Sequence, residues 1–527
     1  MAKVRKAEAS REPRKVGAEW GKGRGVPVIL LCLAAIATLV VIVSFDPLPS
    51  PIGDNAEFAI LARAVASGHG LRYLNHPNLI PATKYPPGFP LMLAMWIPFF
   101  GGSVLTLKVV VAVCFVLLVP LTFLLSRKFL GTSESVIAAL LVATSAGVAT
   151  TLVGVVNYSN EILSDVPYAL FSVAGILLLT DSRRAGSRWA GLALIMWAYV
   201  VRTAGISLVA AAVVYLFLKS HRREALVLAS SCVAFSALWA LRNFMVAGEG
   251  GRYFQVLLAK NPYDPGLGTV GALDVLRRVG INLYGYATGM LQENILPGLV
   301  GLLGRSVAAK LGCLVLLGPV VLGAYDLRGR ALLPNLYVVL YVATYLIWPQ
   351  VWLSGRFMVP IAPIAAFYFV AGVLGLFDRL KVEKLAALVV CAVIAAPNIY
   401  STSAYATRER GYSAGWNHYL SGAVWARDNT PAESVFLCRS AFMFYIFSER
   451  KAIQYPFTRD ESEMRSYLFK WHPDYIVVDK ALGFPQTDYY LLPVLVNMED
   501  MLQAVYSTSD PQNVIFRFTP ASTGGSQ

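Results

Sequence analysis

The feature that most constrains this chain is a series of long apolar stretches without charge. Residues 26–45 supply twenty such residues in a row, and about 20 apolar residues are needed to cross the hydrocarbon core of a bilayer as a helix. Ten further stretches are predicted to be membrane helices: 104–125, 135–156, 163–180, 189–200, 204–218, 225–241, 309–325, 332–347, 357–377 and 385–400. Charged residues make up 14% of the chain, against about 25% in soluble proteins. The sequence therefore predicts a mainly α, polytopic membrane protein with about 11–13 transmembrane helices.

The distribution of positive charge indicates an orientation. The net charge is +14, and eight Lys or Arg precede residue 26. Further basic residues stand between alternate apolar stretches, as the positive-inside rule describes for cytoplasmic loops. We expect a cytoplasmic basic tail over residues 1–25, an inner (plasma) membrane location and an extracytoplasmic C-terminus. The charge is thus explained by contact with membrane lipids, and nucleic acid is not expected as a partner.

The composition changes after Tyr400. Two segments, 417–428 and 460–470, are predicted helices, and 434–438, 475–479 and 513–518 are predicted strands. Alternating strands and helices favour an α/β domain of ordinary size. We therefore divide the chain into the tail, a membrane domain over 26–400 whose largest extracytoplasmic loops are 46–103 and 242–308, and an extracytoplasmic α/β domain over 401–527. Asp479, at a strand end, is open to two interpretations, a turn cap or a ligand contact.

Two carboxylates follow the first apolar stretch, Asp54 and Glu57. A carboxylate at this place is suited to act as a general base on an acceptor or to position it. The same spacing is typical of a capping box that opens a helix over residues 55–66. Both interpretations stay open on spacing alone.

Lys84 begins the run Lys84-Tyr85-Pro86-Pro87-Gly88. The prolines remove backbone donors and fix an extended turn, which would hold the ammonium group against an anion such as a phosphate. The alternative is a lysine that snorkels to the membrane surface and anchors the apolar stretch after it.

Further charges stand at predicted extracytoplasmic helix ends. Glu161 and Asp165 are four residues apart, which places them on one face of a helix; each is either an acceptor-site group or a charge that stabilises the helix N-terminus. Arg202, Arg242 and Arg356 are candidates for binding a phosphate, since guanidinium binds it with two parallel hydrogen bonds. Their alternative role is anchoring to lipid headgroups.

The order of these features resembles the GT-C superfamily of polytopic glycosyltransferases, in particular the bacterial relatives of protein O-mannosyltransferases and of the lipid A aminoarabinose transferase. The matching segments are Gly53-Asp54-Asn55-Ala56-Glu57-Phe58, the Lys84 turn, Ser164-Asp165-Val166-Pro167-Tyr168, Arg202-Thr203-Ala204-Gly205, Trp239-Ala240-Leu241-Arg242-Asn243, and Arg356 with Pro360 and Pro363.

The resemblance implies transfer of a sugar, with inversion, from a polyprenyl-phosphate-linked donor to an envelope acceptor, which is a protein, lipid A or a glycan. It implies that Asp54 is the catalytic residue and that Lys84 and Arg356 hold the donor phosphate. Several relatives have adjacent Asp and Glu in the first loop, whereas this chain reads Asp54-Asn55 with the glutamate at position 57. No metal-ligand set or cofactor motif is evident, and we expect that none is required. A transporter or flippase of a lipid-linked sugar is the alternative function, since it would also place charges in a membrane protein.

Overall fold

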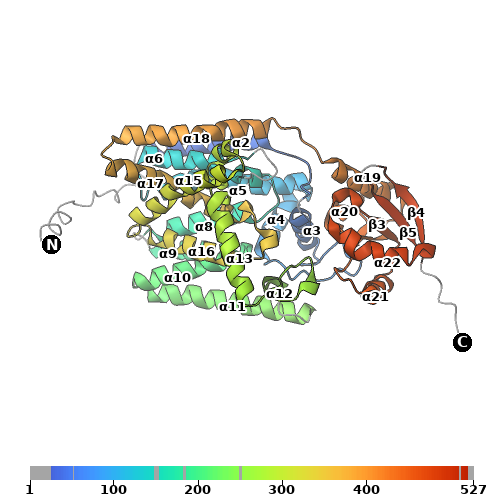
Figure 1. The fold of residues 1–527 in the computed structure, drawn as a ribbon. Helices are drawn as coiled ribbons and strands as arrows, with labels where there is room; N and C mark the ends of the chain where they lie inside the picture. Colours follow the sequence, from blue (N-terminus) through green and yellow to red (C-terminus); the bar gives the residue numbers. More distant parts are fainter. Residues whose placement is uncertain are drawn as a thin grey trace.

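The computed structural model describes residues 25–51, 53–147, 154–181, 185–247, 252–509 and 512–519. Helices gather in one large part of the molecule, and a smaller part built around a sheet lies at the C-terminal end of the chain (Figure 1). This arrangement confirms the predicted fold class, a mainly α membrane protein with a C-terminal α/β unit. The predicted basic tail, apart from Gly25, lies outside the described residues.

Six described helices are long and apolar enough to cross a membrane: α2 (Val26–Ser44), α5 (Val104–Ser126), α11 (Arg222–Ala247), α15 (Val307–Asp326), the continuous unit of η6 (Gly355–Ile361) and α17 (Ala362–Arg379), and α18 (Lys384–Ala406). Shorter apolar helices pack among them: α4 (Gly88–Phe100), α6 (Thr132–Ala143), α8 (Asp165–Leu179), α9 (Ala185–Val201), η1 (Thr203–Gly205) with α10 (Ile206–Leu218), and α16 (Leu332–Leu346). The remaining helices of this part are α3 (Gly53–Ala66), α7 (Val155–Ser159), α12 (Arg252–Leu258), η2 (Pro265–Leu267), α13 (Ala272–Gly285), η3 (Tyr286–Met290), η4 (Gln292–Asn294), α14 (Pro297–Leu303) and η5 (Gln350–Trp352).

The predicted span over residues 135–156 is wrong as a single helix. Helix α6 ends at Ala143, and α7 begins only at Val155. Polar side chains bind the backbone at this break: Ser145 Oγ accepts from the amide of Val155 at 3.3 Å, and the Asn157 side chain accepts from the amides of Gly147 and Gly154 at 2.8 Å each. Such side-chain bonds offer the backbone an alternative to the hydrogen bonds of a helix. The mean hydropathy of residues 135–156 does not reveal these bonds.

The C-terminal part contains a five-stranded sheet with the order β2-β1-β3-β5-β4. Its strands are β1 (Val435–Cys438), β2 (Lys451–Gln454), β3 (Tyr475–Val478), β4 (Leu502–Ser507) and β5 (Val514–Phe518). β1 pairs in parallel with β2 and β3, while β5 pairs antiparallel with β3 and β4. The helices of this part are α19 (Ala414–Asn429), α20 (Ala441–Ser448), α21 (Glu461–Trp471), η7 (Lys480–Leu482), η8 (Thr487–Leu491), α22 (Leu492–Val496) and η9 (Glu499–Met501). The division of the chain at residue 401 stays a prediction; helix α18 continues to Ala406.

Helix α3 belongs to both parts of the molecule. Phe58, Ala59 and Ala62 are buried in the core of the helical part. Ala56 is buried instead with Tyr419, Phe436 and their neighbours in the sheet-bearing part. The beginning of α3, which carries Asp54 and Glu57, is therefore fixed at the junction of the two cores.

The loop after α3 is attached to the sheet. The amide of Ala452 in β2 donates to the Asn75 carbonyl at 2.7 Å, and the Asn75 side chain donates to the Ala452 carbonyl at 2.8 Å. Lys451 donates to the Leu74 carbonyl at 2.7 Å. The two bonds to Ala452 occupy its backbone groups at the β2 edge, which would otherwise be open to pairing with another chain.

Helices α15 and α17 approach each other closely through glycines. A Cβ atom at Gly372 would collide with the carbonyl of Pro319, and one at Gly323 would collide with the carbonyl of Tyr368. Small residues at such crossings let two backbones touch, which is a common basis of helix association in membranes.

We expect Gly372→Ala to destabilise the protein by about 1–3 kcal/mol, because the added methyl group overpacks this crossing. Gly318→Ala is the matched control in α15, since a Cβ there would meet nothing within 4 Å and alanine is the better helix former. The measurement is the midpoint of thermal unfolding in detergent. Equal midpoints for the two variants would contradict the close approach.

Candidate functional site

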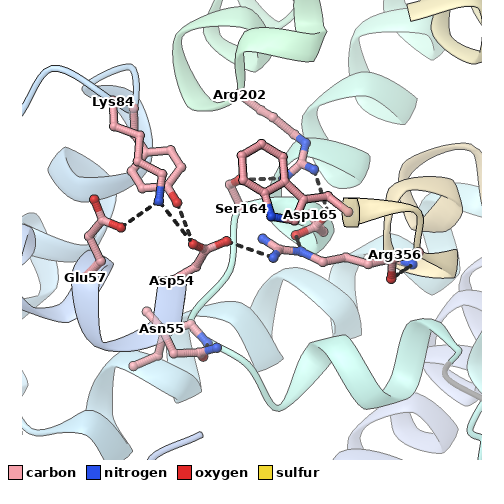
Figure 2. Close-up of polar contacts among 12 residues, drawn as sticks. Asp54, Asn55, Glu57, Lys84, Ser164, Asp165, Arg202 and Arg356 are labelled. Atoms are coloured by element: carbon pink, nitrogen blue, oxygen red, sulfur yellow. Dashed lines mark hydrogen bonds and ion pairs between the residues drawn. The ribbon is translucent and has the colours of Figure 1, made fainter. Parts of the chain in front are cut away.

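Asp54 lies in the first turn of α3 and binds three side chains from distant parts of the sequence. Its Oδ1 accepts hydrogen bonds from the Tyr85 hydroxyl at 2.6 Å and from Lys84 Nζ at 3.4 Å, and its Oδ2 accepts one from Arg356 Nη1 at 2.9 Å (Figure 2). The three predicted residues Asp54, Lys84 and Arg356 are thus in direct contact.

These contacts set the ionisation of Asp54 and Lys84. Burial alone would raise the pKa of Asp54, but the charges of Lys84 and Arg356 and the hydrogen bonds from Tyr85 and Arg356 hold it well below its ordinary value. Burial would likewise lower the pKa of Lys84, but the charges of Glu57 and Asp54 raise it well above the usual range. Both groups are therefore charged at neutral pH, and Asp54 is a weak base while these cations hold it.

Glu57 is the second carboxylate of the first loop, and its side chain is 2% exposed. It accepts hydrogen bonds from Lys84 Nζ at 2.9 Å and from the Tyr73 hydroxyl at 2.7 Å. The hydrogen bonds of Asp54 and Glu57 described here all come from side chains, so they do not form the reciprocal backbone contacts of a capping box. Glu57 fixes the ammonium group of Lys84 from the side opposite Asp54.

The turn that carries Lys84 is held against the end of α9. A Cβ atom at Gly88 would stand 2.5 Å from the Val200 carbonyl oxygen, so the start of α4 can approach this helix only with glycine at that position. The Lys84 ammonium also lies 4.4 Å from the centre of the Tyr85 ring, a cation–π contact. The lysine is accordingly paired with carboxylates and is not an anchor extended towards lipid.

Arg356 continues the chain of charges to the other side of the site. Its Nε donates to Asp165 Oδ2 at 2.9 Å, and Asp165 Oδ1 lies 3.0 Å from Arg202 Nη2. Arg202 also donates to Ser164 Oγ at 3.0 Å and to the Tyr345 hydroxyl at 3.2 Å. Asp165 is 0% exposed, so both arginines hold their guanidinium groups against a fully buried carboxylate.

The prediction that Glu161 and Asp165 share a helical face is wrong, because α8 begins at Asp165 and Glu161 precedes it in a turn. Burial raises the pKa of Glu161, although the Lys108 charge and a hydrogen bond from Ser50 act in the opposite direction. Its Oε2 is buried without a hydrogen-bond partner among the described residues. Asp165 belongs to the charged cluster by direct contact, whereas Glu161 lies beside it.

Arg242 does not reach the cluster. Its guanidinium group donates to the carbonyls of Ala82 and Leu71 and to the Asn243 side chain. These contacts hold the two ends of the loop between Leu71 and Ala82, which precedes Lys84. Arg242 therefore supports the lysine through the backbone, and its contact with a donor phosphate stays a prediction.

Several polar groups of the site escaped sequence reasoning. The hydroxyls of Tyr73, Tyr85 and Tyr345 bind its charged groups, yet a tyrosine in an apolar sequence gives no sign of its role. Glu293 was missed as well: a Cβ atom on Gly355, next to Arg356, would lie 2.9 Å from its Oε2. Burial raises the pKa of Glu293 to about 7, against the lowering effect of Arg305. Its place, beside the Asn294 side chain that donates to the Gly355 carbonyl at 2.8 Å, is visible only in the fold.

No protein-family model and no curated protein sequence matches this chain significantly. Solved structures do. The oligosaccharyltransferase AglB of Archaeoglobus fulgidus, in complex with an inhibitory peptide and a dolichol-phosphate, matches with a TM-score of 0.58 and 14% identity over 95% of this chain and 75% of its own. ArnT of Cupriavidus metallidurans bound to undecaprenyl phosphate matches with a TM-score of 0.58 and 14% identity over 96% and 100% of the two chains. The chain has the GT-C fold.

ArnT in its apo state matches the chain similarly, with a TM-score of 0.58 and 12% identity over 92% of this chain and 97% of its own. The likeness in fold therefore extends over nearly the full length of both proteins. This architecture and the apolar helices make the chain a membrane protein. Within the described ranges, no three His, Cys, Asp or Glu residues are grouped to hold a metal ion.

We expect Asp165→Asn to lower the free energy of unfolding by about 3–5 kcal/mol, because it leaves two buried guanidinium groups without their shared carboxylate. Asp326→Asn is the control: Asp326 also pairs with an arginine, Arg379, but that arginine is 49% exposed, and exposed pairs contribute about 0–1 kcal/mol. Denaturant unfolding followed by tryptophan fluorescence measures both variants. Similar small losses in both would show that Asp165 does not hold the cluster together.

Proposed function

We propose that the protein is a glycosyltransferase that moves a sugar from a polyprenyl-phosphate-linked donor to an acceptor of the cell envelope. The observation that carries the proposal is the convergence of Asp54, Lys84 and Arg356 in one contact cluster. The GT-C fold supports it, as do the names of two matching structures, which were solved with a dolichol-phosphate and with undecaprenyl phosphate.

The cations of the cluster suit the leaving group. When the bond between the anomeric carbon and the phosphate oxygen breaks, its electron pair stays on the phosphate, which gains a negative charge. Fixed cations stabilise such developing charge strongly where water is scarce. Lys84 and Arg356 would contact this phosphate, and Arg202, which pairs with the same Asp165 as Arg356, adds a second guanidinium nearby.

The charge balance of the resting cluster explains how Asp54 could become an effective base. Three carboxylates, Asp54, Glu57 and Asp165, face three cations, Lys84, Arg202 and Arg356. A donor phosphodiester adds one negative charge and competes for the same cations. Both effects raise the pKa of Asp54, so donor binding would release a carboxylate that is otherwise too weak a base.

The reaction then needs one further group. The acceptor oxygen or nitrogen attacks the anomeric carbon from the face opposite the phosphate and forms the new glycosidic bond with inversion. Its proton passes to Asp54, and the polyprenyl phosphate departs with the electron pair of the broken bond. No general acid is required, because the phosphate is a good leaving group; glycosidases, in contrast, must protonate theirs. Glu57 would act by holding Lys84 in place.

We further propose the orientation that the basic loops indicate. The chain would lie in the inner (plasma) membrane with its N-terminus in the cytoplasm, and the cluster and the C-terminal sheet would face the extracytoplasmic side. The acceptor would accordingly be a protein, lipid A or a glycan of the envelope.

Asp54→Asn is expected to insert and fold normally but to lose transfer by about 100-fold or more, the usual contribution of a general base. The assay is reconstitution in liposomes with polyprenyl-phosphate sugars and detection of the glycosylated acceptor. Asp500→Asn, at an exposed aspartate of η9, should retain full activity. Transfer by Asp54→Asn at the wild-type rate would remove this residue from the mechanism, and movement of the donor across the bilayer without transfer would favour a flippase.

Lys84→Gln should raise the KM for the donor, because the phosphate loses a direct cation. Arg242→Gln should leave the KM for the donor close to that of the wild type and lower the melting temperature instead, since the hydrogen bonds that this arginine makes to described residues go to the Leu71 and Ala82 carbonyls and the Asn243 side chain, all neutral groups. The same donor titration and a thermal melt in detergent separate the two effects. A larger KM effect in Arg242→Gln than in Lys84→Gln would reverse the assignment.

A further inference from the structure

The C-terminal sheet has an edge at which ligands commonly bind. β1, β2 and β3 run parallel, so their carboxyl ends meet on one side. From β1 the chain moves to β2 on one flank and later to β3 on the other. Crevices outside the carboxyl ends of parallel strands, where the order reverses in this way, are the usual ligand sites of open α/β sheets. Arg439 follows β1 at this edge, and Asp479 follows β3.

Three buried polar atoms at this edge lack a hydrogen-bond partner among the described residues: Arg439 Nε, Asp479 Oδ2 and Gln486 Oε1. Asp479 is 0% exposed, and its other oxygen accepts a hydrogen bond from Thr487, the residue after Gln486. A buried polar atom without a partner lowers the stability of the folded protein. A donor and two acceptors left open in one place indicate a site that a bound polar molecule would complete.

The Arg439 guanidinium is a cation held by aromatic rings. It lies 4.8 Å from the centre of the Phe457 ring, 5.0 Å from that of Phe484 and 5.8 Å from that of Tyr263. No carboxylate of the described chain lies within ion-pair distance of it. Cation–π contacts fix its position without neutralising its charge, so the site retains a net attraction for an anion.

Asp479 complements this cation in a second way. Burial raises the pKa of its carboxyl group to about 7, although the Thr487 hydrogen bond and the Arg439 charge lower it. Near neutral pH the group therefore carries a proton much of the time and is able to donate a hydrogen bond to a ligand hydroxyl. The side chain of Asp479 makes no cap hydrogen bond at the start of η7. The interpretation of Asp479 as a turn cap is therefore not supported, and the interpretation as a ligand contact stays open.

Aromatic side chains connect this edge with the charged cluster. The ring centres of Tyr263 and Trp352 are 5.9 Å apart, and the Trp352 indole donates a hydrogen bond to the Tyr263 hydroxyl. The ring centre of Trp348 lies 6.0 Å from that of Trp352 and 6.3 Å from that of Tyr345. Tyr345 in turn accepts hydrogen bonds from Arg202. Partly buried aromatic rings with a few fixed polar groups are the usual lining of small-molecule sites.

We infer that the carboxyl edge of the sheet binds an acidic sugar of the acceptor, with its carboxylate or phosphate on Arg439 and its hydroxyls on Asp479 and Gln486. The identification of the bound molecule as the acceptor rests on the proposed glycosyltransferase function. The binding itself does not, and it is tested without any transfer reaction.

The experiment measures amide hydrogen exchange of the full-length protein in nanodiscs, in peptides covering residues 436–442 and 478–487. The probes are glucuronate, glucose 1-phosphate and the neutral methyl glucoside. We expect one or both acidic sugars to protect these peptides and the neutral sugar to leave them unchanged. Protection by glucuronate alone or by glucose 1-phosphate alone identifies the acidic group as a carboxylate or a phosphate.

Arg439→Gln should weaken this protection roughly tenfold or more, as expected for loss of a charge-assisted bond, and Arg439→Lys should weaken it less. The control is Arg459→Gln, which removes a 70% exposed arginine paired with Asp264 and should bind as the wild type does. Asp54→Asn should also bind normally, which separates this site from the reaction. Absence of protection in the wild type, equal protection by the neutral sugar, or undiminished protection in Arg439→Gln would each overturn the inference.

Discussion

An unbroken series of ion pairs, Asp54–Arg356–Asp165–Arg202, organises the centre of this molecule. Its members come from α3, η6, the start of α8 and the break between α9 and η1, four places that only the complete fold brings together. Buried charges are stable only when each is paired. The helices that carry them are therefore constrained to one arrangement, and packing features such as Gly88 against Val200 serve the same arrangement.

The charged cluster already contains the groups that the proposed reaction would use, the carboxylate of Asp54 and the cations Lys84 and Arg356. In the absence of donor, carboxylates neutralise every cation, and Asp54 is held as a weak base. A bound donor phosphate would take Lys84 and Arg356 as its partners, and Asp54 would then be the one carboxylate of the cluster without a cation. Binding and activation would thus be coupled by electrostatics alone, through groups that already touch.

Much of this was predictable from sequence. Charge-free stretches such as 26–45 identified the membrane fold, and the Lys84-Tyr85-Pro86-Pro87-Gly88 turn and Arg356 pointed to the residues that contact Asp54. Periodicity could not place Glu161, because the chain turns just before α8, nor Arg242, whose partners are backbone carbonyls 160 and 171 residues away. Strands β2 and β4 were missed because polar residues interrupt them, whereas β1 and β3, which are as short as β2, are continuous apolar runs. Arg439 and Glu293 lack any sequence motif, since their surroundings arise from tertiary contacts.

The bonds between Asn75 and Ala452 and between Lys451 and Leu74 have a mechanical consequence. They fasten the sheet to a loop whose far end, after Ala82, leads within two residues to Lys84. A tilt of the sheet as it takes up a bulky molecule would pull on this tether and shift the ammonium group with it. Occupancy of the sheet edge would then shift Lys84 through these hydrogen bonds and the chain segment that follows Asn75.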